Sequence, residues 1–114
     1  MNAIDIHIAT GGRKFDAAGE VVIMLHGSGQ NHLTWVLQSR YFAYRGFAVL
    51  APDFPGHGLS GGSPLKSIEA MAAWVIDLMD SLDIKRAILV GHSQGCLVTI
   101  EAAASYSDRI QRVA

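Results

Sequence analysis

The sequence predicts an α/β fold, in which a largely parallel sheet carries helices on both of its faces. Three continuous apolar runs lead to this prediction, at residues 21–25, 47–51 and 87–90. Such runs are typical of strands that are covered on both faces, as in a parallel sheet. Because strands and helical patterns alternate from residue 21 onward, we expect parallel βαβ units with right-handed crossovers. The chain has 114 residues, which is enough for one domain with one core.

The N-terminal segment predicts an antiparallel hairpin ahead of the parallel units. Ile4, Ile6 and Ile8 alternate with other residues, which is the pattern of a half-buried strand. The pair Gly11-Gly12 then predicts a tight turn, and residues 13–17 predict a short return strand.

Helices are expected after each of the three apolar runs. Residues 33–45 form the first, with Gly46 placed as its C-terminal cap. Ser67 can cap the second, whose apolar residues recur at helical spacing up to Leu82. A third helix begins behind Ser93, and residues 108–114 predict a turn and the first residues of another strand.

The most informative stretch is Gly91-His92-Ser93-Gln94-Gly95, which lies between the last apolar run and a helical pattern. It matches G-x-S-x-G, the signature of a nucleophile elbow, in the strand–turn–helix context that the motif requires. Glycines two residues before and after the serine remove side chains that would collide in so sharp a turn. The helix that follows directs its first N–H groups toward the serine, where they would stabilise a developing anion.

Three motifs in this chain, each after an expected strand, resemble those of the α/β-hydrolase family. Residues 26–29 (His-Gly-Ser-Gly) stand where the family has its oxyanion loop. Residues 53–60 resemble the family loop D-x-x-G-x-G-x-S, and residues 91–95 resemble its elbow. The resemblance implies that residues 1–114 are the N-terminal part of a single α/β-hydrolase domain, with strands 1–5 and the start of strand 6.

The family's strand order, 1-2-4-3-5-6-7-8, has a consequence for the edge of the sheet. It implies that the strand at residues 87–90 lies inside the sheet. Because the sixth strand stops at Val113-Ala114, we expect it to leave the strand at 87–90 almost uncovered. An uncovered apolar strand invites pairing between molecules, so we expect possible self-association through this edge.

The resemblance also implies a mechanism, the hydrolysis of a small carboxylic ester. Ser93 would attack the acyl carbonyl and form an acyl-enzyme. The backbone N–H groups of Gln94 and Ser28 would form the oxyanion hole. His26 would orient the oxyanion loop, and Gly27 belongs to the same motif. Gly91, His92 and Gly95 would support the elbow.

The family also has an acid and a histidine after the serine, in that order. No histidine follows Ser93, and the acids that follow are Glu101 and Asp108. Neither acid is at the place where the family has its acid. We therefore expect an incomplete chain that lacks the acid and histidine of the triad and is inactive alone.

Other functions compete with this interpretation. Residues 56–61 fit the dinucleotide pattern G-x-G-x-x-G, but the next helix starts only near Ser67, too late to meet a pyrophosphate. A non-catalytic member of the fold, acting through interactions, would explain the missing histidine. A branch of the family with an aspartate nucleophile, which includes dehalogenases and epoxide hydrolases, is disfavoured by the serine at position 93.

Composition excludes further classes of partner. The net charge of −1 gives no electrostatic reason to expect nucleic acid or anionic membrane as a partner. We expect no cofactor, no metal, no membrane span and, without a visible signal peptide, a cytoplasmic location.

The remaining polar residues and the single cysteine have structural explanations. The single cysteine, Cys96, is expected in the core. His7, His32 and His57 are expected on the surface or in loops, and Asp53 is expected to fix its loop by side-chain–backbone hydrogen bonds.

Overall fold

The computed structural model describes residues 5–114 and shows a five-stranded sheet of order β1-β3-β2-β4-β5. The strands are β1 (Ile8–Ala9), β2 (Val21–Leu25), β3 (Ala48–Pro52), β4 (Ala87–Gly91) and β5 (Ile110–Val113). β2, β3, β4 and β5 are parallel, whereas β1 is antiparallel to β3. This is the predicted fold class, and the four parallel strands β3-β2-β4-β5 follow the order 4-3-5-6 that the family resemblance implied.

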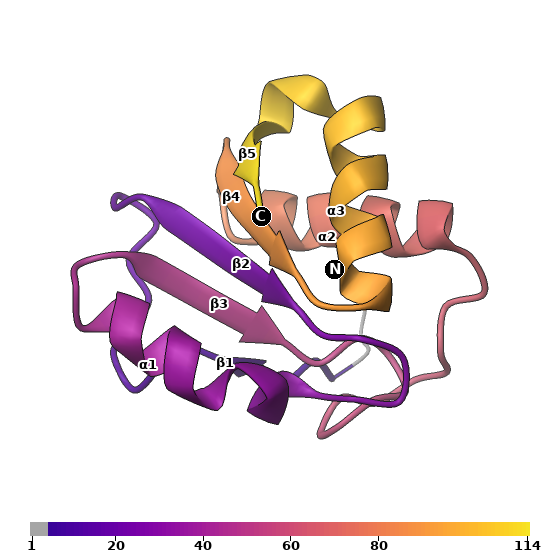
Figure 1. Cartoon of the computed structure of the whole chain (residues 1–114), viewed down its shortest axis with the longest axis horizontal. Helices are drawn as coiled ribbons and strands as arrows, with labels where there is room; N and C mark the ends of the chain where they lie inside the picture. Colours follow the sequence, from indigo (N-terminus) through magenta and orange to yellow (C-terminus); the bar gives the residue numbers. More distant parts are fainter. Residues whose placement is uncertain (1–4) are drawn as a thin grey trace.

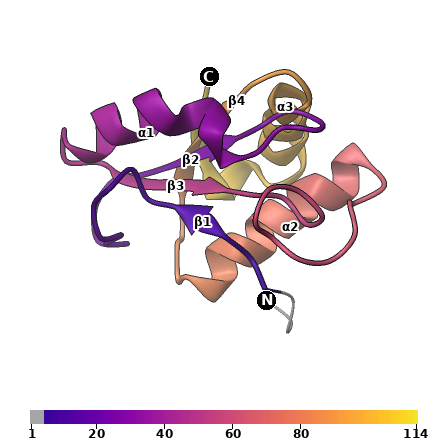
Figure 2. The same ribbon diagram turned by 90° about the horizontal axis from the view of Figure 1, so that it is seen from below.

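Helices cover both faces of the sheet (Figures 1 and 2). They are α1 (Val36–Ala43), α2 (Ile68–Ser81) and α3 (Gln94–Ser105), with short 3-10 helices η1 (His32–Trp35) and η2 (Ser107–Arg109). α1 follows η1 on one face, and α2 and α3 pack together on the other. Among residues 5–114, no helix combines the length and apolar character that crossing a membrane requires.

The two faces of the sheet contribute to two apolar clusters, since successive side chains of a strand point to opposite faces. Val21, Ile23 and Leu25 of β2 pack in the cluster that contains α2 and α3. Val22 and Met24 pack on the other face, with Trp35 of η1. All five residues of β2 are buried, as the continuous apolar run predicted.

The predicted N-terminal hairpin is wrong in one respect. Ile4 lies outside the described residues, β1 begins only at Ile8, and residues 13–17 form no strand. Asp16 closes a local turn instead, because its carboxylate accepts the N–H of Ala18 at 3.0 Å and its carbonyl accepts the N–H of Gly19 at 3.1 Å. β1 pairs instead with β3, in antiparallel orientation, and forms the edge of the sheet.

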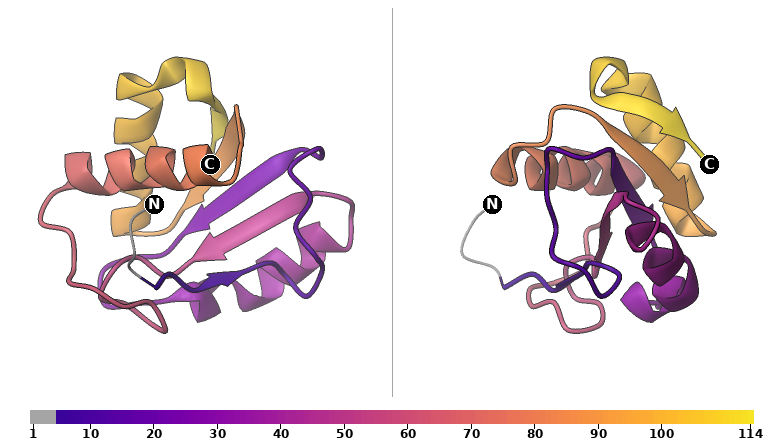
Figure 3. Two further views of the ribbon diagram at one scale, coloured as in Figure 1. Left: turned by 180° about the vertical axis from the view of Figure 1, so that it is seen from behind. Right: turned by 90° about the vertical axis from the view of Figure 1, so that its left-hand side faces the viewer.

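The prediction that the strand at 87–90 is left almost uncovered is also wrong. β5 pairs with β4 from Ala87 to Leu89, and Ala114 continues the ladder by accepting the N–H of Gly91 at 2.9 Å. A four-residue strand is long enough to cover β4, because β4 itself has only five residues. The outer strand on this side is β5 (Figure 3).

Helix ends agree with the sequence patterns in part. The Ser67 side chain accepts the N–H of Ala70 at 3.0 Å and caps α2 as predicted. The first helix was expected to begin at Leu33, but its first turn is the 3-10 helix η1, capped by Asn31.

Candidate active site

The candidate site lies where β2, β3 and β4 end. The carboxyl ends of parallel strands share one edge of a sheet, and in Figure 1 the three arrowheads point the same way. This edge brings together the loop after β2, with His26 to Gln30, and the loop after β3, with Asp53 to Ser60. The turn between β4 and α3 holds Ser93.

Ser93 connects β4 to α3 in a strained conformation. Its backbone has φ 58° and ψ −120°, and its side chain is exposed. A positive φ is rare outside glycine and costs on the order of 1–3 kcal/mol, which the surrounding structure must offset. The turn is held by N–H donation from Gly95 to His92 O at 3.0 Å and from Cys96 to Ser93 O at 2.9 Å.

The glycines that flank Ser93 are sites of close backbone approach. A Cβ at Gly91 would lie 2.5 Å from the carbonyl carbon of Gly95. A Cβ at Gly95 would overlap the carbonyl oxygen of Leu25 at the end of β2. The turn therefore leaves no room for a side chain at either position, which allows α3 to start directly against β2.

The loop after β2 lies against the serine. A Cβ at Gly27 would lie 3.0 Å from Ser93 Cβ and 3.2 Å from His92 O. Ser28 follows Gly27 and is exposed. Neither the N–H of Ser28 nor that of Gln94 donates a hydrogen bond to another of the residues 5–114. Both N–H groups therefore have no hydrogen-bond acceptor among the described residues.

Gln30 connects this loop to the elbow, and the sequence analysis missed it. Its Oε1 accepts the N–H of Gly27 at 2.8 Å and lies 3.3 Å from His92 Nδ1. The hydroxyl of Thr34 donates to the same oxygen at 3.4 Å. The motifs contain no signal for Gln30, because its partners are only defined once β2 and β4 lie side by side.

His26 is almost fully buried and links the loops after β2 and β3. Its Nδ1 lies 2.8 Å from Gly27 O, and its Nε2 accepts the N–H of Phe54 at 3.1 Å. Nε2 accepts, so the proton is on Nδ1 and the ring is neutral. Burial lowers the pKa of His26 from its ordinary value of 6.5, and the contact with Gly27 only partly opposes this. Since both ring nitrogens are engaged, His26 holds the loop in place.

Comparison with known proteins agrees with this geometry. The family model described as the alpha/beta hydrolase fold matches residues 20–114. The chain belongs to this family. The chain is 32% identical over 118 residues to epoxide hydrolase A of Mycobacterium tuberculosis, and this match covers 99% of the chain and 35% of that protein. It is also 36% identical over 97 residues to an uncharacterized protein of the same species, with 84% of this chain and 28% of that protein covered.

A solved structure shows the same arrangement of elements. The enol-lactonase from Burkholderia xenovorans superposes with a TM-score of 0.84 at 32% identity, covering 98% of this chain and 43% of that one. The chain spans between 28% and 36% of the length of three of its curated relatives.

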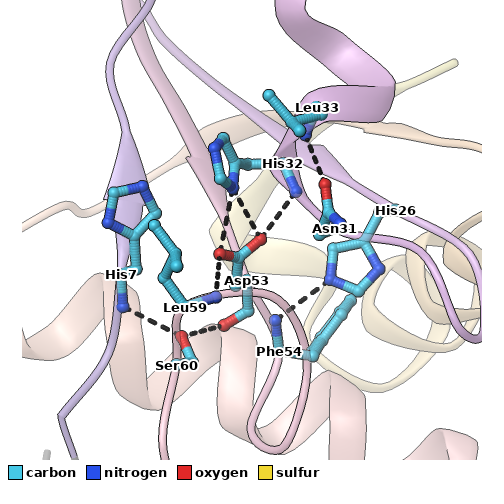
Figure 4. A network of polar contacts seen from close by, with 9 residues as sticks. All are labelled: His7, His26, Asn31, His32, Leu33, Asp53, Phe54, Leu59 and Ser60. Carbon is cyan, nitrogen blue, oxygen red and sulfur yellow. Dashed lines mark hydrogen bonds and ion pairs between the residues drawn. The ribbon is translucent and has the colours of Figure 1, made fainter.

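A polar network lies in the loop after β3 (Figure 4). The buried carboxylate of Asp53 accepts the N–H groups of His32 at 2.6 Å and Leu59 at 2.9 Å. Ser60 Oγ donates to Asp53 O at 2.7 Å. Burial raises the pKa of Asp53, but the hydrogen bonds from Leu59 and His32 outweigh this effect and lower it overall. The prediction that Asp53 fixes its loop is confirmed.

The other histidines and the cysteine are placed as follows. His57 Nδ1 lies 3.1 Å from Pro55 O, within its own loop as expected. His7 and His32 are half-buried and stack beside Asp53, with ring centroids 4.6 Å apart. Cys96 is exposed, so its expected place in the core is wrong. The buried side of α3 carries Val98. At about 100° per residue, Cys96 lies nearly on the opposite side of the helix, about 160° from Val98.

Proposed function

We propose that this chain carries the nucleophile and the oxyanion hole of a serine-dependent hydrolase that cleaves carboxylic esters. The observation that supports the proposal most strongly is the backbone of Ser93. It holds an exposed hydroxyl at the start of α3 with a positive φ of 58°. Such strain persists only where the surroundings enforce it, and it is concentrated at functional sites.

In the proposed reaction, Ser93 Oγ attacks the acyl carbonyl of the ester. The carbonyl oxygen gains negative charge and is received by the N–H groups of Gln94 and Ser28. Each such donor is typically worth about 3 kcal/mol in the transition state, because it is oriented before the charge develops. The alcohol then leaves, and water hydrolyses the acyl-enzyme to the carboxylic acid.

The proton of Ser93 needs a base, and none of the five histidines follows the serine in the sequence. His26 cannot serve without giving up its contacts to Gly27 or Phe54. We therefore propose that a later segment of a longer protein supplies the histidine and its acid, and that the 114 residues alone turn over esters very slowly. The greater length of the curated relatives supports this proposal.

The substrate class is proposed from the nucleophile. Two of the relatives are named for hydrolysis of epoxides and of enol-lactones. A lactone is a cyclic ester and suits attack by a serine. The epoxide hydrolases of this family use an aspartate at the elbow, and this chain has Ser93 there. We therefore favour an open or cyclic ester over an epoxide.

A fluorophosphonate probe tests the proposal, because it phosphonylates only an activated serine. The chain extended by its in-frame continuation should be labelled, and Ser93→Ala should abolish labelling. Ser105→Ala, on the exposed far end of α3, is the matched control and should label as the wild type does. Labelling that survives Ser93→Ala would refute the assignment. An extended protein that folds but is neither labelled nor hydrolyses p-nitrophenyl acetate would favour the non-catalytic alternative.

A further inference from the structure

Three side chains that could ligate a metal ion meet beside β1, away from Ser93. His7 precedes β1, His32 is the first residue of η1, and Asp53 follows β3. One ligand atom from each lies within 4.8 Å of the other two. We propose that His7, His32 and Asp53 form a binding site for a divalent transition-metal ion such as Zn²⁺.

The distances suit such an ion after two small adjustments, in which the His32 ring and the Asp53 carboxylate move slightly apart and the His7 ring approaches them. Zinc bonds of about 2.0–2.2 Å to imidazole and carboxylate in tetrahedral geometry separate neighbouring ligand atoms by roughly 3.4 Å. His32 Nδ1 is already 3.0 Å from both carboxylate oxygens of Asp53. Only the His7 ring must move closer, by roughly 1–1.5 Å, which rotation about its side-chain bonds can supply.

The backbone around the three ligands is fixed, which limits the cost of binding. The N–H of His7 donates to Ser60 Oγ at 2.9 Å, and its carbonyl accepts the N–H of Asp53 at 2.9 Å. The Asp53 carboxylate is oriented by the N–H groups of His32 and Leu59. Hydrogen bonds of this kind to a ligating carboxylate are a regular feature of metal sites, because they hold it in position.

The donor set determines the class of ion. Two imidazoles and one carboxylate suit Zn²⁺, Co²⁺ or Ni²⁺, whereas Ca²⁺ and Mg²⁺ prefer sites built of oxygen. The ion would take the place of the proton that His32 Nδ1 shares with Asp53. His7 and His32 are partly exposed, so water can complete the coordination shell.

The expected consequence is a cross-link between three segments. The N-terminal strand is short, and it pairs with β3 at Ile8 and Ala9. An ion bound by His7, His32 and Asp53 would tie this short edge strand to η1 and to the end of β3. Since the ion binds the folded chain only, it should raise the melting temperature.

Titration of the tag-free protein with Co²⁺ and Zn²⁺ tests the proposal. We expect one Zn²⁺ per chain by calorimetry, visible absorption from bound Co²⁺, and a rise in Tm of roughly 10 °C at a free Zn²⁺ concentration about one hundred times the Kd. His7→Gln and His32→Gln should each weaken binding at least tenfold, whereas His57→Gln should bind as the wild type does.

A measurement on the unaltered protein guards against variants that fail to fold. In imidazole NMR spectra, Zn²⁺ should shift the ring signals of His7 and His32 and leave those of His57 and His92 in place. The proposal is overturned if no ion binds at one per chain, if both Gln variants bind as tightly as the wild type, or if Zn²⁺ shifts the signals of other histidines instead.

Discussion

The loops at the carboxyl edge of the sheet are held in two different ways. The elbow after β4 depends on close backbone contacts at Gly91 and Gly95, where no side chain fits, and Gly95 meets the end of β2. The loop after β3 is held by one buried carboxylate, Asp53, which accepts hydrogen bonds from Leu59 in the same loop and from the more distant His32. The first region depends on glycines that carry no side chain, and the second depends on hydrogen bonds to one carboxylate.

This difference has consequences for tolerance to change. A backbone contact cannot relax when a side chain is added, because both partners belong to packed strands and helices. A hydrogen-bonded carboxylate can be replaced by a similar group, but any N–H that it leaves unpaired in the interior destabilises the fold. We therefore expect glycine substitutions at the elbow to have the larger effect.

Gly95→Ala should give the largest loss of stability, and it tests whether the elbow has no room for a side chain. The new Cβ would overlap the carbonyl oxygen of Leu25, which is part of a buried strand and cannot move away. We expect a loss of at least about 3 kcal/mol in the free energy of unfolding, and a larger loss for Gly95→Val. Urea unfolding followed by circular dichroism measures it.

Gly19→Ala is the matched control for this substitution. Its Cβ would meet only ordinary contacts, at 3.6 Å from Asp16 O and 3.7 Å from Ala48 Cβ, and its φ lies outside the left-handed region. The free energy of unfolding should change by less than about 1 kcal/mol. Equal effects of the two substitutions would show that the elbow has no special need for glycine.

Asp53→Asn should give the second largest effect and tests the polar half of the comparison. Asparagine has one acceptor oxygen in place of two, so its NH₂ group would face either the N–H of Leu59 or that of His32 in a buried site. We expect a loss of about 2–3 kcal/mol in the free energy of unfolding. The exposed Asp77→Asn on α2 should change it by less than about 0.5 kcal/mol, and a comparable loss there would contradict the explanation.

The same contrast explains how much the sequence could predict. The elbow is local, because its glycines, its serine and the flanking strand and helix occupy adjacent positions, and a short motif can therefore specify it. The cluster of His7, His32 and Asp53 joins residues up to 46 positions apart, as the separation of 7 and 53 shows. No pattern along the chain indicates such a meeting, and the two histidines were accordingly expected to be unremarkable.

The errors in the predicted fold also arise because contacts between distant residues leave no pattern along the chain. Alternating isoleucines and a Gly-Gly pair predicted a strand near the N-terminus, which the structure shows at Ile8–Ala9, but they could not specify its partner. The partner is β3, which becomes available only when the parallel sheet has formed. Cys96 was misplaced because an apolar residue on a helix was assigned to the core before the buried side of α3 was known.

His26 joins the two regions, and its titration sharpens the comparison between them. The buried ring is neutral, and burial lowers its pKa below the ordinary value of 6.5. As the pH falls below about 6.5, the unfolded chain takes up a proton at this residue and the folded chain does not. The stabilisation is thus complete above that pH and is lost progressively as the pH falls toward the lowered pKa of the folded state.

The contribution of His26 to this pH dependence can be isolated by comparing variants. Between about pH 7.5 and 5.5, His26→Gln should reduce the slope of unfolding free energy against pH relative to the wild type, by at most about 1.4 kcal/mol per pH unit. Val22→Ala serves as the control, since it truncates a buried side chain of β2 without removing a titratable group. It should lower stability at every pH while keeping the wild-type slope. A slope that is unchanged in His26→Gln would mean that the ring is protonated as easily in the folded protein as in the unfolded chain. The link between the loops after β2 and β3 would then not depend on a neutral imidazole.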